Sequence, residues 1–157
     1  MNKAAILTLI IEQLGADLAV LEQAVAMARD TATHADCLGS SKYETMGLEA
    51  SYLAQGQGIR LLEVERSLTY FKGLVVESAA VIGLSSLVAL VDEQGDLQLL
   101  WLAAQAGGLK VYDGEMTITV ITPQSPLGRT LLGKEVGDAI EIDIAGEKRC
   151  YEIGAVL

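Results

Sequence analysis

The sequence predicts an α+β protein in two parts: an antiparallel helical hairpin over residues 1–73, and a small antiparallel sheet domain with one short helix over residues 74–157. Two observations predict this division. The first part carries a heptad pattern of apolar residues, which is typical of helices packed as a coiled coil. The second part alternates short apolar runs with Gly and Asp turns, as strands and hairpins do.

The composition narrows the classes of function. The 157 residues include 21 acidic and 11 basic ones, which gives a net charge of −10. Duplex binding needs clustered Lys and Arg, and the chain has no such run, so we expect no sequence-specific DNA binding. The single His and the distant Cys37 and Cys150 do not have the spacing of a zinc site. We therefore expect free thiols in a cytoplasmic protein.

The apolar runs are expected to belong to a soluble protein. Charged or turn residues interrupt each run before it reaches the roughly 20 residues that a membrane helix needs. The N-terminal stretch lacks a clean cleavage site and soon becomes acidic, so it does not have the pattern of a signal peptide. We expect no membrane contact.

The first arm of the hairpin follows one heptad seam. Its apolar positions step by four and three residues through Leu7, Ile11, Leu14, Leu18, Leu21, Val25 and Ala28. This spacing places them on one side of a helix. Two arms of about 28 residues would form a rod on the order of 40 Å long. Residues 31–42, which are rich in Ser, Thr and Gly, are expected to form the bend between them.

The second arm has two candidate stripes, and the sequence leaves both open. One stripe includes small residues near the bend and larger ones near the base: Tyr43, Gly47, Ala50, Ala54, Gln57, Leu61, Val64, Leu68 and Phe71. The rival stripe passes through Leu48, Tyr52, Ile59 and Leu62. Either stripe has the spacing of a helix face.

The second half has the turn and strand signals of a small sheet. Residues 93–96 lie between two apolar runs and predict a hairpin turn. Three further strands are expected at residues 116–121, 139–144 and 149–156. The one helix is expected over residues 125–132, because Pro126 suits a first helical turn and Gly133 suits its end.

The most specific pattern lies between residues 121 and 138. It contains Ser-Pro-Leu-Gly from Ser125, Leu-Leu-Gly-Lys from Leu131, and the pair Gly137-Asp138. This order closely resembles the C-terminal signature of the Gre-family transcription elongation factors. Residues 42–57 look like a short, divergent branch of that family.

The resemblance implies both a fold and a partner. Gre-like factors have an FKBP-like C-terminal domain that docks at the rim of the secondary channel of bacterial RNA polymerase. Their hairpin enters this channel and places acidic side chains beside the catalytic Mg²⁺. The factor is then not an enzyme and holds no cofactor or metal of its own, because it completes the site of the polymerase. The docking residues implied here are Ser125, Pro126, Leu127, Gly128 and Arg129.

The resemblance carries only one tip acid to this chain. Related factors have two acids, seven and four residues before a tyrosine that opens the second arm. With Tyr43 as that tyrosine, the two positions are Asp36 and Gly39, and Glu44 lies just beyond it. A single carboxylate binds a second Mg²⁺ weakly, because affinity depends on the number of charged ligands. We therefore expect docking with weak or absent stimulation of transcript cleavage, and an indirect contact with the RNA 3′ end remains an option.

Two other classes of function stay open. The first is a protein-binding module without cleavage activity, such as a nucleoside-diphosphate-kinase-regulator-like protein, although its hairpin would be shorter. The second is a peptidyl-prolyl isomerase, which fold analogy alone suggests. Aromatic residues make up only 4% of the chain, which disfavours the aromatic pocket that an isomerase needs. The sequence leaves open whether the protein activates or inhibits its partner, its oligomeric state, the condition under which it acts and the role of Cys37.

Overall fold

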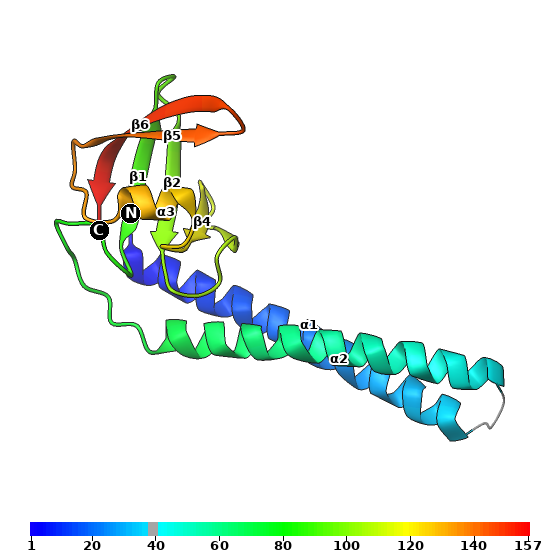
Figure 1. Ribbon diagram of the computed structural model, residues 1–157. Helices are drawn as coiled ribbons and strands as arrows, with labels where there is room; N and C mark the ends of the chain where they lie inside the picture. Colours follow the sequence, from blue (N-terminus) through cyan, green and yellow to red (C-terminus); the bar gives the residue numbers. More distant parts are fainter. Residues whose placement is uncertain (38–40) are drawn as a thin grey trace. The chain divides into compact units, whose positions relative to one another are not determined.

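The computed structural model describes residues 1–37 and 41–157, and the side chains of residues 32–47 and 50 lie outside this description. Two long helices, α1 (Lys3–Cys37) and α2 (Ser41–Lys72), precede a sheet with one short helix (Figure 1). The strands are β1 (Leu87–Asp92), β2 (Leu97–Leu102), β3 (Lys110–Tyr112), β4 (Thr117–Ile121), β5 (Ala139–Ile144) and β6 (Glu147–Val156), and α3 is Pro126–Leu131. The expected α+β class is confirmed.

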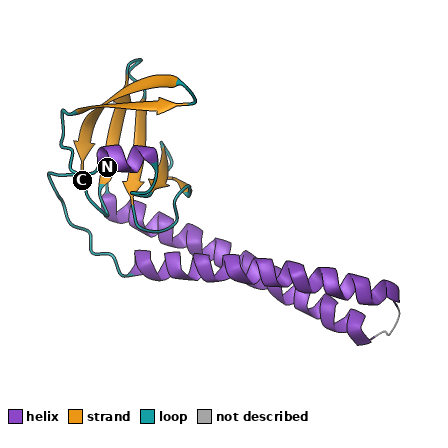
Figure 2. Cartoon of the chain, viewed as in Figure 1, coloured by secondary structure: helices purple, strands orange, loops and turns teal. Residues whose placement is uncertain are grey.

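By packing, the chain forms two compact units. One consists of residues 12–69, and the other combines residues 1–11 with residues 70–157. The first turns of α1 and the last residues of α2 therefore pack with the sheet domain, although they lie within the helices along the chain. The order of helices first and strands second follows the expected sequence of parts (Figure 2).

Within the unit of residues 12–69, α1 and α2 lie side by side, and burial identifies the stripe of α2 that faces α1. On α1, Leu14, Val25 and Ala28 of the predicted seam are buried. On α2, Ala54 is buried while Leu61 and Val64 are half-buried. The rival stripe of α2 is more than half exposed at each of its four positions. The first of the two candidate stripes therefore forms the seam.

Helix α1 is longer and more apolar than expected. It continues to Cys37, through a segment that the sequence assigned to the bend. Residues 3–31 are also long and apolar enough to cross a membrane by length and composition, contrary to the expectation that no such run exists. A core helix of a soluble protein or a signal sequence meets the same test, and only 22% of this window is buried.

The sheet is mostly antiparallel, as expected, but one parallel pairing makes it mixed. Its strand order is β3-β4-β2-β1-β6-β5. Neighbouring strands are antiparallel except β2 and β4, which pair in parallel from Leu99 with Ile118 to Leu102 with Ile121. The chain crosses from β2 to β4 through residues 103–116, which include the edge strand β3. The predicted turn at residues 93–96 joins β1 to β2, and the strand predictions near residues 117, 139 and 149 are confirmed.

Both faces of the central strands are buried. Helix α3 covers one face, where Leu131 packs with alternate residues of the strands in a cluster of Ile82, Val88, Leu90, Leu100, Leu102, Ile140, Ile142 and Ile153 (Figure 1). On β2, the intervening residues Leu99 and Trp101 are also buried. A side chain every second residue points to the same face, so continuous burial requires a cover on each side.

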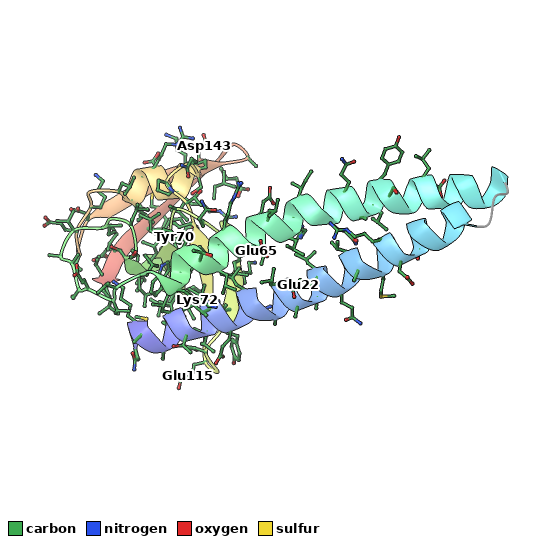
Figure 3. All side chains as sticks on the ribbon, turned by 90° about the horizontal axis from the view of Figure 1, so that it is seen from below. Glu22, Glu65, Tyr70, Lys72, Glu115 and Asp143 are labelled. Carbon is green, nitrogen blue, oxygen red and sulfur yellow. The ribbon has the colours of Figure 1, made fainter. Side chains whose placement is uncertain are left out.

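The start of α1 contacts this second face. The Nζ of Lys3 lies 5.8 Å from the centre of the Trp101 ring and donates a hydrogen bond to the backbone carbonyl of Glu77. Burial lowers the pKa of Lys3, and the nearby charge of Glu77 acts in the opposite direction. The hydroxyl of Tyr70, labelled in Figure 3, accepts a hydrogen bond from the Ala104 amide at 3.2 Å. These contacts explain why both helix bases belong to the compact unit of the sheet.

Replacing helical glycines in the hairpin is expected to stabilise it. No atom lies within 4 Å of the position that a Cβ would take on Gly15 or Gly58, and both residues lie inside helices. Gly15→Ala and Gly58→Ala should each raise the free energy of unfolding by up to about 1 kcal/mol, because alanine restricts the unfolded backbone and favours the helix. Urea unfolding followed by far-UV circular dichroism measures the change. A lower stability in both variants would show that these glycines are needed for packing.

Candidate functional site

The segment that carries the sequence signature connects β4 to β5 and includes α3. Ser125 caps α3: its hydroxyl accepts a hydrogen bond from the Gly128 amide at 3.0 Å and donates one to the Thr122 carbonyl at 2.7 Å. Pro126 follows as the first helical residue, where its missing N–H leaves no helical hydrogen bond unmade. The predicted helix is confirmed, and its start is fixed by Ser125.

Gly128 is required by a close contact between backbone segments. It is buried, and a Cβ at this position would lie 2.0 Å from the carbonyl oxygen of Thr122 and 2.9 Å from the Ser125 hydroxyl oxygen. No other side chain fits in this space without moving the loop. Ser125 and Gly128 therefore stabilise the backbone of the segment that connects β4 to α3. The Ser125 hydroxyl and the Cβ position of Gly128 both point toward Thr122.

Backbone hydrogen bonds join the second half of the signature to the segment around Ile82, which follows α2 in the chain. The amide of Gly133 donates to the Ile82 carbonyl at 2.9 Å, and the amide of Ile82 donates to the Lys134 carbonyl at 2.8 Å. The carboxylate of Asp138 accepts a hydrogen bond from the Glu135 amide at 2.8 Å and closes the turn that contains Gly137. Gly137 has a φ of +90°, which favours glycine. These residues explain much of the pattern as structure.

Two of the five implied docking residues present exposed side chains. Pro126 and Arg129 are exposed, whereas Leu127 is half-buried against the core. The Arg129 guanidinium donates a hydrogen bond to the Gln124 carbonyl at 3.0 Å, which holds its side chain beside the start of α3. Arg129 is therefore the residue of this group that offers a charge to a partner.

Sequence reasoning missed three exposed apolar side chains in the signature segment and in the strand bridge beside it. Leu132, Val136 and Val81 are 40%, 57% and 44% exposed. Leu132 directly follows α3, and Val81 pairs with Glu135 in an isolated β-bridge next to Val136. Turn positions are usually occupied by polar residues, glycine or proline. An apolar residue close to the turn glycines is therefore the sequence signal for such an exposed position. We refer to Arg129, Leu132, Val136 and Val81 as the α3 surface.

The tip residues lie outside the part of the chain with described side chains. By backbone, Asp36 and Cys37 belong to α1 and Glu44 belongs to α2, but their side chains lie outside the described part of the chain. Gly39 lies outside the described residues altogether. Their predicted role near a metal remains a prediction. Among the described residues, no group of three or more His, Cys, Asp or Glu side chains is placed to hold a metal ion.

Cys150 on β6 is a free thiol, as the sequence predicts for it. Desolvation raises the pKa of its thiol, and the carboxylates of Glu93 and Glu141 raise it further. A raised pKa reduces the thiolate fraction at neutral pH, and the thiolate is the nucleophilic form. Cys150 therefore does not have the environment of a reactive cysteine.

Known proteins resemble this chain along most of its length. The family model "Transcription elongation factor, GreA/GreB, C-term" matches residues 111–157. Transcription elongation factor GreA of Beijerinckia indica is 30% identical over 133 residues, which cover 83% of this chain and 77% of the relative. GreA of Nitrobacter winogradskyi is 30% identical over 139 residues, with coverages of 87% and 80%.

Solved structures with similarity to this chain include two from the same group of factors. GreA factor homolog 1 of Thermus thermophilus is 27% identical and covers 95% of both chains, with a TM-score of 0.40. The GreA/GreB factor of Nitrosomonas europaea is 24% identical over 64% of this chain and 78% of its own, with a TM-score of 0.38. The two GreA relatives, each 30% identical to this chain, determine its family.

The chain is a two-part protein in which a helical hairpin is followed by a small mixed sheet, and its sequence relatives are transcription elongation factors. The chain belongs to the GreA/GreB family of transcription elongation factors. The nucleoside-diphosphate-kinase-regulator-like alternative is not favoured by these relatives.

Gly128→Ala is expected to destabilise the sheet unit by about 1–3 kcal/mol, because the added methyl group forces Thr122 and Ser125 apart. Arg129→Ala is the control on the same helix, and its exposed side chain should change the free energy of unfolding by at most about 0.5 kcal/mol. Urea unfolding followed by Trp101 fluorescence reports on this unit, because Trp101 is the only tryptophan. Equal stability of Gly128→Ala and the unsubstituted protein would contradict the close contact.

Proposed function

We propose that this protein is a regulator of transcription elongation that binds bacterial RNA polymerase in the cytoplasm at the rim of the secondary channel. Membership in the GreA/GreB family is the observation that supports this most strongly. The α3 surface is the docking site, and it offers the positive charge of Arg129 together with exposed apolar side chains. An apolar contact with a charge at its edge is a common form of protein–protein interface.

The hairpin supplies the reach of the factor. Helices of 35 and 32 residues correspond to a length on the order of 50 Å at 1.5 Å per residue. In this proposal, a pair of helices of this length extends into the secondary channel, which the sheet domain does not enter. The seam supports this role, because two helices that bury a common stripe are stiffer than either helix alone.

The chemistry at the end of this rod depends on the number of carboxylates. In two-metal phosphoryl transfer, two cations stabilise the attacking and the leaving oxygen, and hard oxygen ligands hold them. Asp36 offers one such ligand and Gly39 offers none. We infer that this protein occupies the channel and stimulates RNA cleavage weakly or not at all. It then regulates the polymerase through occupancy rather than through metal binding.

Binding to core polymerase tests the docking site. Arg129→Glu should weaken binding about tenfold, equivalent to about 1.4 kcal/mol, because it reverses the charge at the interface. Arg149→Glu on β6 is the matched control, since Arg149 is also exposed and lies outside the α3 surface. Surface-immobilised polymerase and each purified variant give the dissociation constants. Binding that does not compete with a GreA factor would contradict the secondary-channel assignment.

Restoring the second acid tests the chemistry. Gly39→Asp should raise cleavage of RNA in a backtracked complex on the order of tenfold, because it adds a charged ligand and lowers the barrier by about 1.4 kcal/mol. Gly39→Asn is the control of equal size without the charge. Gel analysis of end-labelled RNA measures the rates.

Strong cleavage by the unsubstituted protein would contradict the proposal of a weak factor. Asp36→Ala then determines whether Asp36 carries that activity.

A further inference from the structure

The loop that connects β2 to β3, residues 103–109, is bonded to the strand that leads to α3. The Ala103 amide donates a hydrogen bond to the Ile121 carbonyl at 2.9 Å, and the Gly108 amide donates one to the Val120 carbonyl at 2.8 Å. These two bonds hold both ends of the loop. The loop therefore lies beside the end of β4, where the chain leaves the sheet toward α3.

Thr122, the first residue after β4, contacts this loop through its side chain and the start of α3 through its carbonyl. A Cβ placed on Gly107 would lie 2.8 Å from the Thr122 Cγ2, which is closer than unbonded carbon atoms approach. The Thr122 carbonyl accepts hydrogen bonds from the Ser125 amide at 3.0 Å and the Ser125 hydroxyl at 2.7 Å. The same oxygen occupies the space that a Cβ of Gly128 would need. A shift of the loop that displaces Thr122 therefore also displaces the start of α3.

Space, and not backbone conformation, requires glycine at position 107. Gly108 has a φ of +91°, which favours glycine in any surroundings. The φ of Gly107 is not in this left-handed region, so an alanine can adopt its conformation. The obstacle to alanine is the Thr122 Cγ2 alone, because the Oγ1 and Cβ of Thr122 lie at 3.7 Å and 3.8 Å from the same position, which is ordinary contact. Removal of this methyl group would therefore make room for alanine.

Tyr70, labelled in Figure 3 on the last turn of α2, anchors the loop. The Ala104 amide donates a hydrogen bond to the Tyr70 hydroxyl at 3.2 Å. The Tyr70 ring packs edge-on against the fully buried Phe71, with ring centroids 5.2 Å apart. The bond joins residues that are 34 positions apart in the chain, and both belong to the same compact unit. It thereby connects the end of α2 to the loop that contacts Thr122.

We propose that Gly107 and Thr122 are positioning residues for the α3 surface, and that Tyr70 anchors the loop that carries Gly107. The contact between Gly107 and Thr122 fixes the end of β4, and Thr122 in turn fixes the start of α3. Arg129 then presents its charge from a helix whose first turn is held in place. The inference rests on the proposed function of the α3 surface, and it adds residues that act on docking without touching the partner.

Hydrogen exchange of the free protein, followed by NMR, tests this contact without polymerase. Gly107→Ala should speed exchange of the Gly128 amide about tenfold, because the added methyl group displaces Thr122 and loosens the hydrogen bond to Ser125. The double variant, Gly107→Ala with Thr122→Ser, should restore the original rate, since serine lacks the methyl group that alanine meets. Gly83→Ala is the matched control, because no atom lies within 4 Å of its Cβ position. Unchanged exchange in Gly107→Ala, or a double variant that exchanges as fast as Gly107→Ala, overturns the inference.

Binding to core polymerase separates positioning from stability. Gly107→Ala should weaken binding about tenfold at a temperature at which urea unfolding shows that the variant is folded. The double variant with Thr122→Ser should bind like the unsubstituted protein. If the unsubstituted protein does not bind the polymerase, the proposed function is wrong. If it binds and Gly107→Ala binds equally well, the positioning role is overturned and the proposed function stands.

Removal of one hydroxyl tests the anchor. Tyr70→Phe keeps the ring against Phe71 and loses only the hydrogen bond, so exchange of the Ala104 amide should rise about fivefold. Tyr112→Phe is the matched control, because the Tyr112 hydroxyl donates to the Gly114 carbonyl at 2.8 Å, outside the loop. Equal exchange of the Ala104 amide in Tyr70→Phe and in the unsubstituted protein overturns the role of Tyr70 as the anchor.

Discussion

Burial of one stripe of α2 against α1 is the constraint on which the rest of the hairpin depends. Helices of this length gain stability in water mainly from packing of an apolar face. Once Ala54, Leu61 and Val64 face α1, the positions of all other side chains on α2 follow from the helical repeat. The same constraint leaves Tyr52 and Ile59 exposed on the outer face. It thereby separates the residues that hold the rod together from those that are available to another molecule.

The sequence could predict elements whose signals are local. The seam of α1 follows from the three- and four-residue spacing of Leu14 through Ala28. It is confirmed because Leu14, Val25 and Ala28 are buried and the positions between them are half-buried. The start of α3 follows from Ser125 and Pro126, which have local roles in a helix N-terminus. The alternation of apolar and acidic residues at 139–144 predicts a strand, and β5 is this strand, with Ile140 and Ile142 buried. In each case the deciding interaction lies within a few residues along the chain.

Other features could not be predicted because they depend on distant partners. The parallel pairing of β2 with β4 leaves the alternation of either strand unchanged, so periodicity does not reveal its direction. The stripe of α2 that faces α1 could not be chosen from the sequence, because both stripes have helical spacing. The stripe that does face α1 also contains a polar residue, Gln57. Within the signature, Gly128 suggested a docking surface, whereas its contact with Thr122 accounts for it structurally. The exposure of Leu132 and Val136 depends on the conformation of that loop, which the sequence does not reveal.

Entry of the hairpin into the polymerase is the central claim, and an electron cryo-microscopy map of the complex tests it most directly. We expect the density of α1 and α2 to lie inside the secondary channel, with the bend toward the active centre and the α3 surface at the rim. Density for the sheet domain elsewhere on the polymerase, with the paired helices outside the channel, would contradict this claim.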